Sequence, residues 1–128
     1  GFMHNFLSAR LCLSEVNLSG VDMTHVRMVV VTAPDLDTAA SLVRTLLEEG
    51  LIACGNMVDG VRSLYRWEGK ICDDAEVLLL LKTVARTVPR LKERIVELHP
   101  YDCPEVLSVP VEEGHDDYLS WVMEQVRS

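Results

Sequence analysis

The sequence has 128 residues, of which 48% are hydrophobic and 25% are charged. A chain of this length and composition supports a single hydrophobic core, which excludes a disordered or fibrous protein. Its net charge of −8 argues against nucleic acid as a partner, and no apolar run approaches the roughly 20 residues of a membrane-spanning helix.

The first 24 residues show little regular patterning. The chain opens on Gly1, and residues 6–11 contain Ser and Arg but no acid, as transit sequences do. We expect residues 1–24 to form a disordered or processed N-terminal extension, and residues 25–128 to form the folded domain. No two of the four cysteines form a C-x-x-C pair, which indicates a reducing compartment. The predicted location is therefore the cytoplasm, or an organelle if the extension is a transit sequence.

The pattern predicts a strand, a helix and then a long β-hairpin. Residues 27–33 are rich in β-branched side chains and stop at Pro34, which indicates a buried strand. A helix capped by Asp35 or Asp37 follows, with apolar residues at helical spacing until Gly50. Two long strands are then predicted over residues 52–66, with a bulge at Gly60, and over residues 71–84, with the turn at residues 67–70.

The rest of the chain predicts a helix, a strand and a last helix. Thr87 is the expected cap of the second helix, which has Pro89 in its first turn and ends at His99. Residues 106–111 form the fourth strand, and Asp116 opens the last helix. This βαββαβα order favours an α+β fold, a ferredoxin-like plait with a four-stranded antiparallel sheet, an extended hairpin and a C-terminal helix.

The hairpin is longer than the helices that cover it. A strand of about 13 residues spans roughly 43 Å, whereas a helix of about 12 residues spans only about 18 Å. The overhanging part carries an apolar patch, for which we expect neighbouring subunits as cover; the alternative is a hairpin curled back on its own domain. The patch consists of Leu64, Tyr65, Trp67, Ile71 and Cys72.

Residues 99–105 (HPYDCPE) place an imidazole, a phenol, a thiol and two carboxylates within seven positions, together with two prolines that fix the backbone. One interpretation is a metal site that uses His99 with Glu105 or with a thiolate from elsewhere in the chain. The other is structural, in which the prolines shape the connection to the next strand and His99 ends the helix.

Two further residues, Cys54 and Lys82, have two interpretations each, and Glu76 has one. Cys54 lies on one strand face with Asn56, and it serves either as a metal ligand or nucleophile or as a small core residue. Lys82 either needs an anionic partner or reaches solvent at the end of its strand. Glu76 shares the strand face of Lys82 and is placed to meet a cation from another strand.

Several motifs in register resemble the CutA family of divalent-cation tolerance proteins. They are TAPD at residues 32–35, ACGN at 53–56, SLYRWEGK at 63–70, LKT at 81–83, HPY at 99–101 followed by Pro104 and Glu105, and DYLSW at 117–121. The similarity runs from residue 26 to residue 126, and a match in several motifs is specific where a single one would be weak.

The resemblance implies a ferredoxin-like homotrimer with interlocked hairpins and with the architecture of PII signalling proteins. It implies a role in tolerance of divalent metals, copper or zinc, with ligand clefts between subunits and no catalytic activity, while animal members are linked to acetylcholinesterase anchoring. Some members credited with copper binding have Cys and His where this chain has Val31 and Leu98. The metal residues that it implies are His99, Cys54 and Glu105. The ligand-cleft residues that it implies are Cys54, Asn56, Trp67, Glu68, Glu76, Lys82, Tyr101, Pro104, Glu105, Tyr118 and Trp121.

Two other function classes stay open. An enzyme would use Cys54 or Cys103 as a nucleophile with His99 as its base, although no third group that orients the base is identifiable. A structural or anchoring module, or a PII-like signalling module for a small molecule, would need no direct metal binding.

Overall fold

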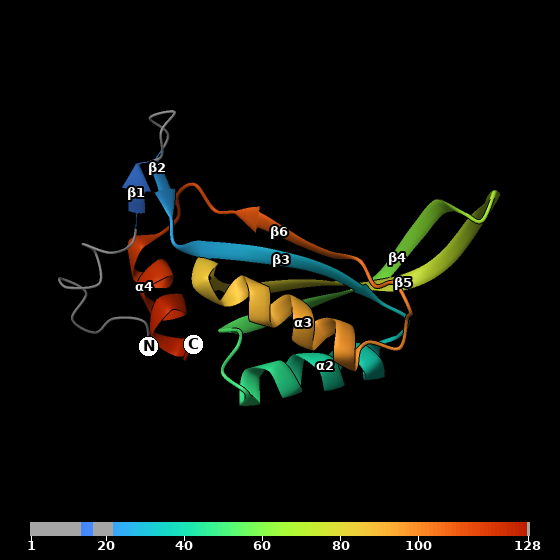
Figure 1. Cartoon of the computed structure of the whole chain (residues 1–128), viewed down its shortest axis with the longest axis horizontal. Helices are drawn as coiled ribbons and strands as arrows, with labels where there is room; N and C mark the ends of the chain where they lie inside the picture. Colours follow the sequence, from blue (N-terminus) through green and yellow to red (C-terminus); the bar gives the residue numbers. More distant parts are fainter. Residues whose placement is uncertain (1–13, 17–21, 128) are drawn as a thin grey trace.

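The computed structural model describes residues 14–16 and 22–127, and the side chains from residue 24 onward (Figure 1). The order of elements confirms the predicted βαββαβα order, with each boundary within two residues of the prediction. The elements are β1 (Ser14–Val16), β2 (Asp22–Thr24), β3 (Val26–Ala33), α2 (Leu36–Glu48), β4 (Cys54–Trp67), β5 (Lys70–Val84), the 3₁₀ turn η1 (Ala85–Thr87), α3 (Val88–Leu98), β6 (Val106–Pro110) and α4 (Asp116–Gln125).

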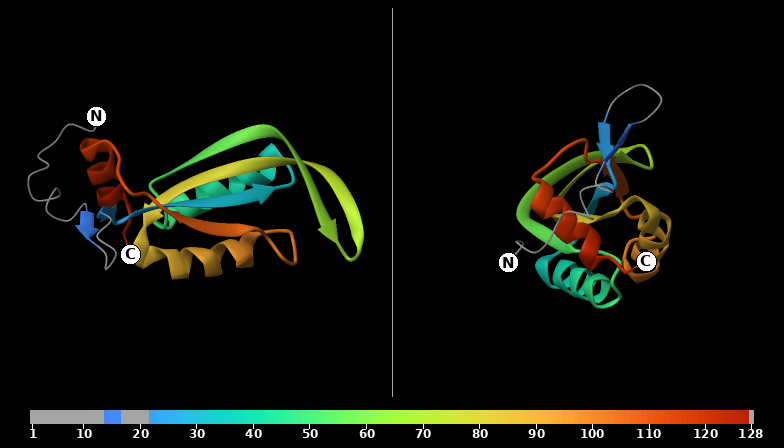
Figure 2. Two further views of the ribbon diagram at one scale, coloured as in Figure 1. Left: turned by 90° about the horizontal axis from the view of Figure 1, so that it is seen from above. Right: turned by 90° about the vertical axis from the view of Figure 1, so that its left-hand side faces the viewer.

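The main sheet has the strand order β4-β5-β3-β6, and every neighbouring pair is antiparallel. Helices α2 and α3 lie side by side on one face of this sheet, while α4 lies at the end of the sheet opposite the tip of the hairpin (Figures 1 and 2). This is the predicted ferredoxin-like arrangement, because both crossover helices lie on the same face.

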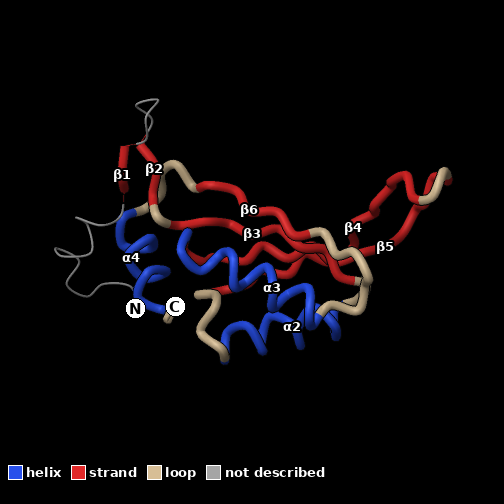
Figure 3. Tube along the Cα trace, viewed as in Figure 1, coloured by secondary structure: helices blue, strands red, loops and turns tan. Residues whose placement is uncertain are grey.

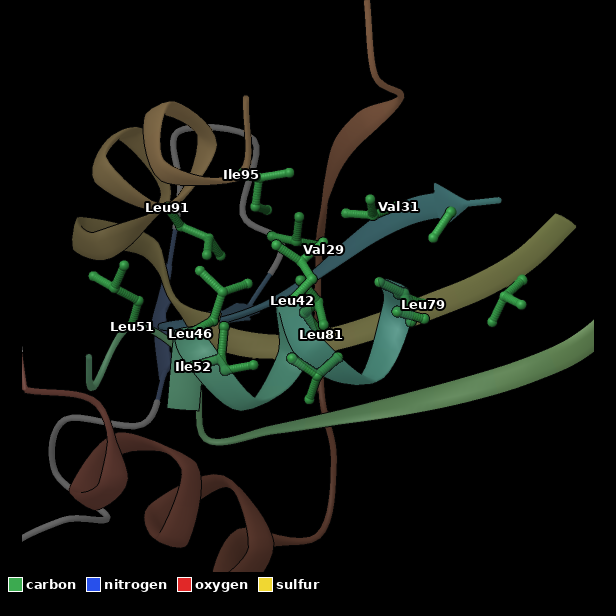
Figure 4. Close-up of a cluster of buried hydrophobic side chains, with 14 residues drawn as sticks. Val29, Val31, Leu42, Leu46, Leu51, Ile52, Leu79, Leu81, Leu91 and Ile95 are labelled. Carbon is green, nitrogen blue, oxygen red and sulfur yellow. The ribbon is translucent and has the colours of Figure 1, made fainter. Parts of the chain in front are cut away.

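The core forms where the two helices meet the sheet (Figure 4). Helix α2 turns Ala39, Leu42, Val43 and Leu46 inward at the i, i+3, i+4, i+7 spacing of a buried helix face. Alternate residues of β3 and β5 meet them, and α3 closes the layer. These residues are Val29, Val31, Ala33, Val77, Leu79, Leu81, Leu91 and Ile95.

The predicted helix caps are right in one case and wrong in another. The Asp35 carboxylate accepts a hydrogen bond of 2.7 Å from the backbone N–H of Thr38, as an N-cap does. Thr87 precedes α3 but makes no capping hydrogen bond, because it ends a 3₁₀ turn, has helical backbone angles and is buried. The extended backbone that places a side-chain cap is missing there.

The hairpin of β4 and β5 extends beyond the rest of the sheet, as its length predicts (Figure 1). β3 pairs with residues 77–84 of β5 only, so residues 70–76 pair with β4 alone. The register slips by one residue between Val58 and Val61, where Gly60 has φ +76°, so the bulge predicted there is confirmed. The turn at Glu68 and Gly69 has positive φ at both residues, the geometry that suits a two-residue hairpin turn.

The sheet face opposite α2 and α3 is only partly covered. Leu107 and Val109 of β6 are 56% and 40% exposed, and Met28 and Val30 of β3, beside them in register, are half-buried. An exposed apolar sheet face of this kind is a surface against which another element or subunit can pack.

Most of the extension predicted over residues 1–24 lies outside the described residues, so that prediction stays open. The described part contains the short antiparallel pair of β1 and β2. Within the described ranges, no helix is long and apolar enough to span a bilayer.

Candidate functional site

A cleft of about 840 Å³ opens at the base of the hairpin, beside the loop that joins α3 to β6. Figure 3 shows this loop at the end of the sheet from which β4 and β5 project. We call it the hairpin cleft. The hairpin contributes Arg62, Ser63, Leu64, Tyr65, Trp67, Asp74 and Glu76, β3 contributes Thr32, and the loop contributes Pro100, Tyr101, Asp102, Cys103 and Glu105.

His99 anchors the loop that forms one wall of the cleft. Its Nδ1 accepts a hydrogen bond of 3.1 Å from the backbone N–H of Tyr101, so the proton of the neutral ring lies on Nε2. Nε2 lies 2.7 Å from the carbonyl oxygen of Thr32 and donates to it. Both ring nitrogens of this buried histidine are therefore occupied, and the contacts match its structural interpretation.

Tyr101 joins the loop to the hairpin. Its hydroxyl donates to Oε2 of Glu76 at 2.9 Å. Burial, together with this hydrogen bond to a carboxylate, raises the pKa of Tyr101 to about 12. Glu76 is only 9% exposed, so the loop covers a carboxylate that its sequence position on the overhanging strand would otherwise leave in solvent.

Two further polar contacts organise the hairpin. The Tyr65 hydroxyl donates to the carboxylate of Asp74, and this bond raises the pKa of the phenol. Arg62 donates two hydrogen bonds to Asp73, at 2.9 and 2.6 Å, and the guanidinium lowers the pKa of that carboxyl. Arg62 is thus already paired with a carboxylate that does not line the cleft.

Another group of predicted site residues lies near α4. The hydroxyl of Tyr118 lies 3.4 Å from Sγ of Cys54, and burial followed by this contact raises the pKa of Tyr118 to about 12. The Tyr118 ring lies beside Trp121, with the ring centres 5.7 Å apart. Lys82 donates to the side-chain oxygen of Asn56, so the ammonium has a neutral partner.

The two groups stand at opposite ends of the sheet within one protomer. Glu76 and Lys82 are six residues apart on β5, which corresponds to about 20 Å. The predicted metal residues His99, Cys54 and Glu105 are not brought together, and the described part of the chain has no cluster of three or more His, Cys, Asp or Glu side chains arranged to hold a metal.

The remaining predicted residues all lie in the hairpin or in the loop beside it. Trp67 lines the hairpin cleft, whereas Glu68 lies at the turn beyond it and Pro104 lies between two lining residues of the loop. Sequence reasoning missed Asp74 and Thr32 as cleft residues. Asp74 could have been predicted, because it lies on the same strand face as Glu76. Thr32 could not, because only the folded structure brings it to the cleft.

The described cysteines, Cys54, Cys72 and Cys103, are free thiols. Cys103 lies in the exposed loop near His99, while Cys54 lies near α4. With both of its ring nitrogens engaged, His99 is not free to act as a base for Cys54 or Cys103.

Comparison with known proteins gives one consistent result. The model of the family "CutA1 divalent ion tolerance protein" matches residues 27–125. The divalent-cation tolerance protein CutA of Pyrococcus horikoshii is 46% identical over 100 residues, which cover 78% of this chain and 97% of that protein. The chloroplastic protein CutA of Arabidopsis thaliana is 39% identical over 101 residues, which cover 79% of this chain and 56% of that protein.

The likeness extends to solved structures. The divalent cation tolerance protein of Thermus thermophilus superposes with a TM-score of 0.78 at 42% sequence identity, covering 80% of this chain and 99% of that one. The matched region contains both groups of predicted site residues.

Proposed function

The chain belongs to the CutA1 family of divalent ion tolerance proteins, and on this premise we propose that it acts as a non-catalytic homotrimer that binds divalent metal ions, copper or zinc, in clefts between its subunits. The hairpin is the observation that carries the proposal. It projects beyond its own helices and exposes large apolar side chains, with Leu64 62% and Ile71 73% exposed.

The uncovered sheet face supports the same assembly. Leu107 and Val109 lie on it, and β4 and β6 leave both edges of the sheet unpaired among the described residues. Association of three copies would shelter these apolar faces and strand edges.

A site that uses both groups of predicted residues requires more than one copy. About 20 Å of strand separates Glu76 from Lys82 within a protomer. Neighbouring copies would bring Cys54 of one copy to Glu105 of another, so that a soft thiolate and a carboxylate hold the metal together. His99 joins this set only by releasing the carbonyl of Thr32 or the N–H of Tyr101.

Light scattering on the full chain tests the assembly. The expected mass is three times the 14.4 kDa of one chain, and a single species at the mass of one chain overturns the proposal.

Calorimetric titration with Zn²⁺ and Cu²⁺ tests the metal site. We expect Cys54→Ser and Glu105→Gln each to weaken metal binding at least about tenfold, because even the loss of a residue that only hydrogen-bonds to a metal ligand lowers the affinity by that much. The control Glu93→Gln lies on the exposed surface of α3 and should bind metal as wild type does. No heat with wild type rejects direct metal binding. His99→Ala is titrated in the same way, and an unchanged affinity removes His99 from the set.

A PII-like small-molecule module or an anchoring module is the second candidate function. The observation that favours it is the state of His99, whose two nitrogens are engaged, in a chain whose described residues hold no ready metal cluster. Wild type that forms a trimer but gives no heat with either metal would favour this function. An anchoring role in particular predicts that substitutions in the cleft leave partner binding unchanged.

We place the protein in the cytoplasm, or in an organelle if residues 1–24 act as a transit sequence. The Arabidopsis relative is named as chloroplastic, which is an organellar location for that relative. A reporter fused to residues 1–24 that stays in the cytoplasm excludes the transit function.

A further inference from the structure

The outer surface of α3 is basic, although the chain as a whole is acidic. Residues 85–94 hold four bases and one acid, which gives this segment a net charge of +3 in a chain of net charge −8. The bases are Arg86, Arg90, Lys92 and Arg94, and the acid is Glu93. Helices α2 and α3 lie on the sheet face opposite the one that the proposed assembly buries (Figure 1). This surface therefore stays accessible in the proposed trimer.

One of the four bases has its charge matched within the chain. Arg94 donates hydrogen bonds of 2.8 and 2.7 Å to the carboxylate of Glu49, at the end of α2, and lies 3.5 Å from Glu97. The other three bases are exposed and form no ion pair with a described residue. Their charge is available to a partner outside the protomer.

The position of these bases is unfavourable for the isolated domain. Arg90 is the third residue of α3, and the first turn of this helix holds no acid. A base near the N-terminus of a helix opposes the helix dipole. Arg86 lies one turn earlier and adds repulsion between like charges. A sequence that departs from such local preferences often does so for function, and an anionic partner would offset both effects.

Exposed apolar side chains lie beside these charges. Pro89, Lys92 and Val96 follow the i, i+3, i+7 spacing of one helix face, and all three are exposed, Val96 to 52%. A polypeptide presents carboxylates and aliphatic side chains together, whereas the backbone of a nucleic acid presents phosphates and is repelled by a chain of net charge −8. The surface thus suits an acidic segment of a protein.

We propose that this surface docks an acidic peptide segment of a partner protein, with Asp or Glu carboxylates on the bases and an aliphatic side chain on the apolar residues. Arginine suits this task because its planar guanidinium binds a carboxylate at two points. The inference goes beyond the proposed function and depends neither on metal binding nor on the hairpin cleft. The docking residues, which we call the α3 surface, are Arg86, Pro89, Arg90, Lys92 and Val96.

Fluorescence anisotropy of a labelled peptide with the full chain tests the partner class. The probe is the octapeptide Glu-Glu-Leu-Glu-Glu-Val-Glu-Glu, and its uncharged analogue has Gln in place of every Glu. We expect the acidic peptide alone to bind, more weakly as salt is added, because the charges on the α3 surface are exposed. No binding of the acidic peptide, or equal binding of the analogue, overturns the proposal. Tighter binding to an octathymidylate or to phosphatidylserine vesicles than to the peptide overturns it as well.

Substitutions then locate the docking surface. Arg90→Glu and the control Arg44→Glu, on the exposed surface of α2, change the net charge equally. We expect Arg90→Glu to weaken peptide binding at least about threefold, because an exposed ion pair is replaced by repulsion, and Arg44→Glu to bind nearly as wild type does. Lys92→Glu provides a second test if Arg90→Glu disturbs the start of α3. Equal affinity in Arg90→Glu, Lys92→Glu and the control overturns the placement.

A substitution of opposite sign sharpens the test. Glu93→Gln removes the acid from the middle of the basic segment, and we expect it to strengthen peptide binding, whereas a weaker affinity contradicts an electrostatic contact.

Light scattering at low and high salt separates a partner protein from a second copy of this chain. Glu112 and Glu113 are exposed and offer carboxylates of the same kind. A mass at low salt above that of the proposed trimer, which Arg90→Glu lowers to that of the trimer, assigns the α3 surface to a second copy and overturns the proposal. We expect the same mass at both salt concentrations.

Discussion

Tyr101 and Glu76 lie 25 residues apart in the sequence, and one hydrogen bond of 2.9 Å joins them across the base of the hairpin. Tyr101 belongs to a loop that His99 holds against β3, and Glu76 is the last residue of β5 before β3 joins the strand. The contact therefore links the loop after α3, which is held against β3, to the projecting part of the hairpin.

Removal of this hydroxyl will destabilise the domain. In Tyr101→Phe the buried Glu76 carboxylate loses its hydrogen-bond donor, which we expect to cost about 1–2 kcal/mol in the free energy of unfolding. Urea unfolding measures this change. Tyr65→Phe is the control, because the Tyr65 hydroxyl bonds to an exposed partner and its loss should cost less. Equal losses in the two variants would contradict a special role for the Tyr101 contact.

All three tyrosines of the chain will resist ionisation. The pKa values of Tyr101 and Tyr118 are raised to about 12, and the pKa of Tyr65 is raised as well. In the unfolded chain tyrosine loses its proton near pH 10. Between about pH 10 and 12 the folded state thus binds more protons than the unfolded state, and the free energy of unfolding falls as pH rises.

Ultraviolet absorbance during an alkaline titration measures this behaviour. We expect almost no phenolate signal at pH 10 in the folded protein and about half of the full signal at the same pH in urea, because the pKa of tyrosine in the unfolded chain is about 10. Half of the tyrosine signal present at pH 10 under native conditions would contradict the buried, carboxylate-bonded environments.

The fold was predictable because its signals are local. The β-branched run in residues 27–33, the helical spacing before Gly50 and the bulge at Gly60 each depend on neighbouring residues, and the overhang follows from strand and helix rise alone. The cap at Thr87 failed because a 3₁₀ turn begins just before α3, and nothing in the local sequence distinguishes that turn from the helix.

The site was less predictable because its contacts are between distant segments. Strand alternation places Glu76 and Lys82 on one face, but it does not reveal that a loop 25 residues later covers only the first of them. The separation of Cys54 from His99 also depends on contacts between distant segments. Cys54 pairs with Lys82 of β5, whereas Thr32, which His99 contacts, pairs with Leu78, four residues earlier on the same strand.

Gly55 of β4 lies against core side chains that leave little room for a Cβ atom. A Cβ atom there would lie 2.9 Å from Leu81 Cδ2 and 2.9 Å from Val43 Cγ1, both core side chains. We expect Gly55→Ala to cost about 1–3 kcal/mol in the free energy of unfolding, since an overpacked core must shift. Thermal and urea unfolding measure this, with Ser63→Ala on the exposed hairpin as the control. Wild-type stability would show that the core yields without strain.

If three copies associate through the apolar face of the hairpin, charged substitutions on that face will disrupt the assembly more than charged substitutions elsewhere on the surface. Ile71 and Leu64 lie on the same face of the hairpin and are 73% and 62% exposed in one protomer. A charge buried there without a partner opposes association, so we expect Ile71→Asp to shift the mass in light scattering from three chains toward one. Val96→Asp is the matched control, because Val96 is 52% exposed on the outer surface of α3, away from the hairpin. If Ile71→Asp keeps the wild-type mass while Val96→Asp lowers it, the subunits associate through the helices and the hairpin account of assembly fails.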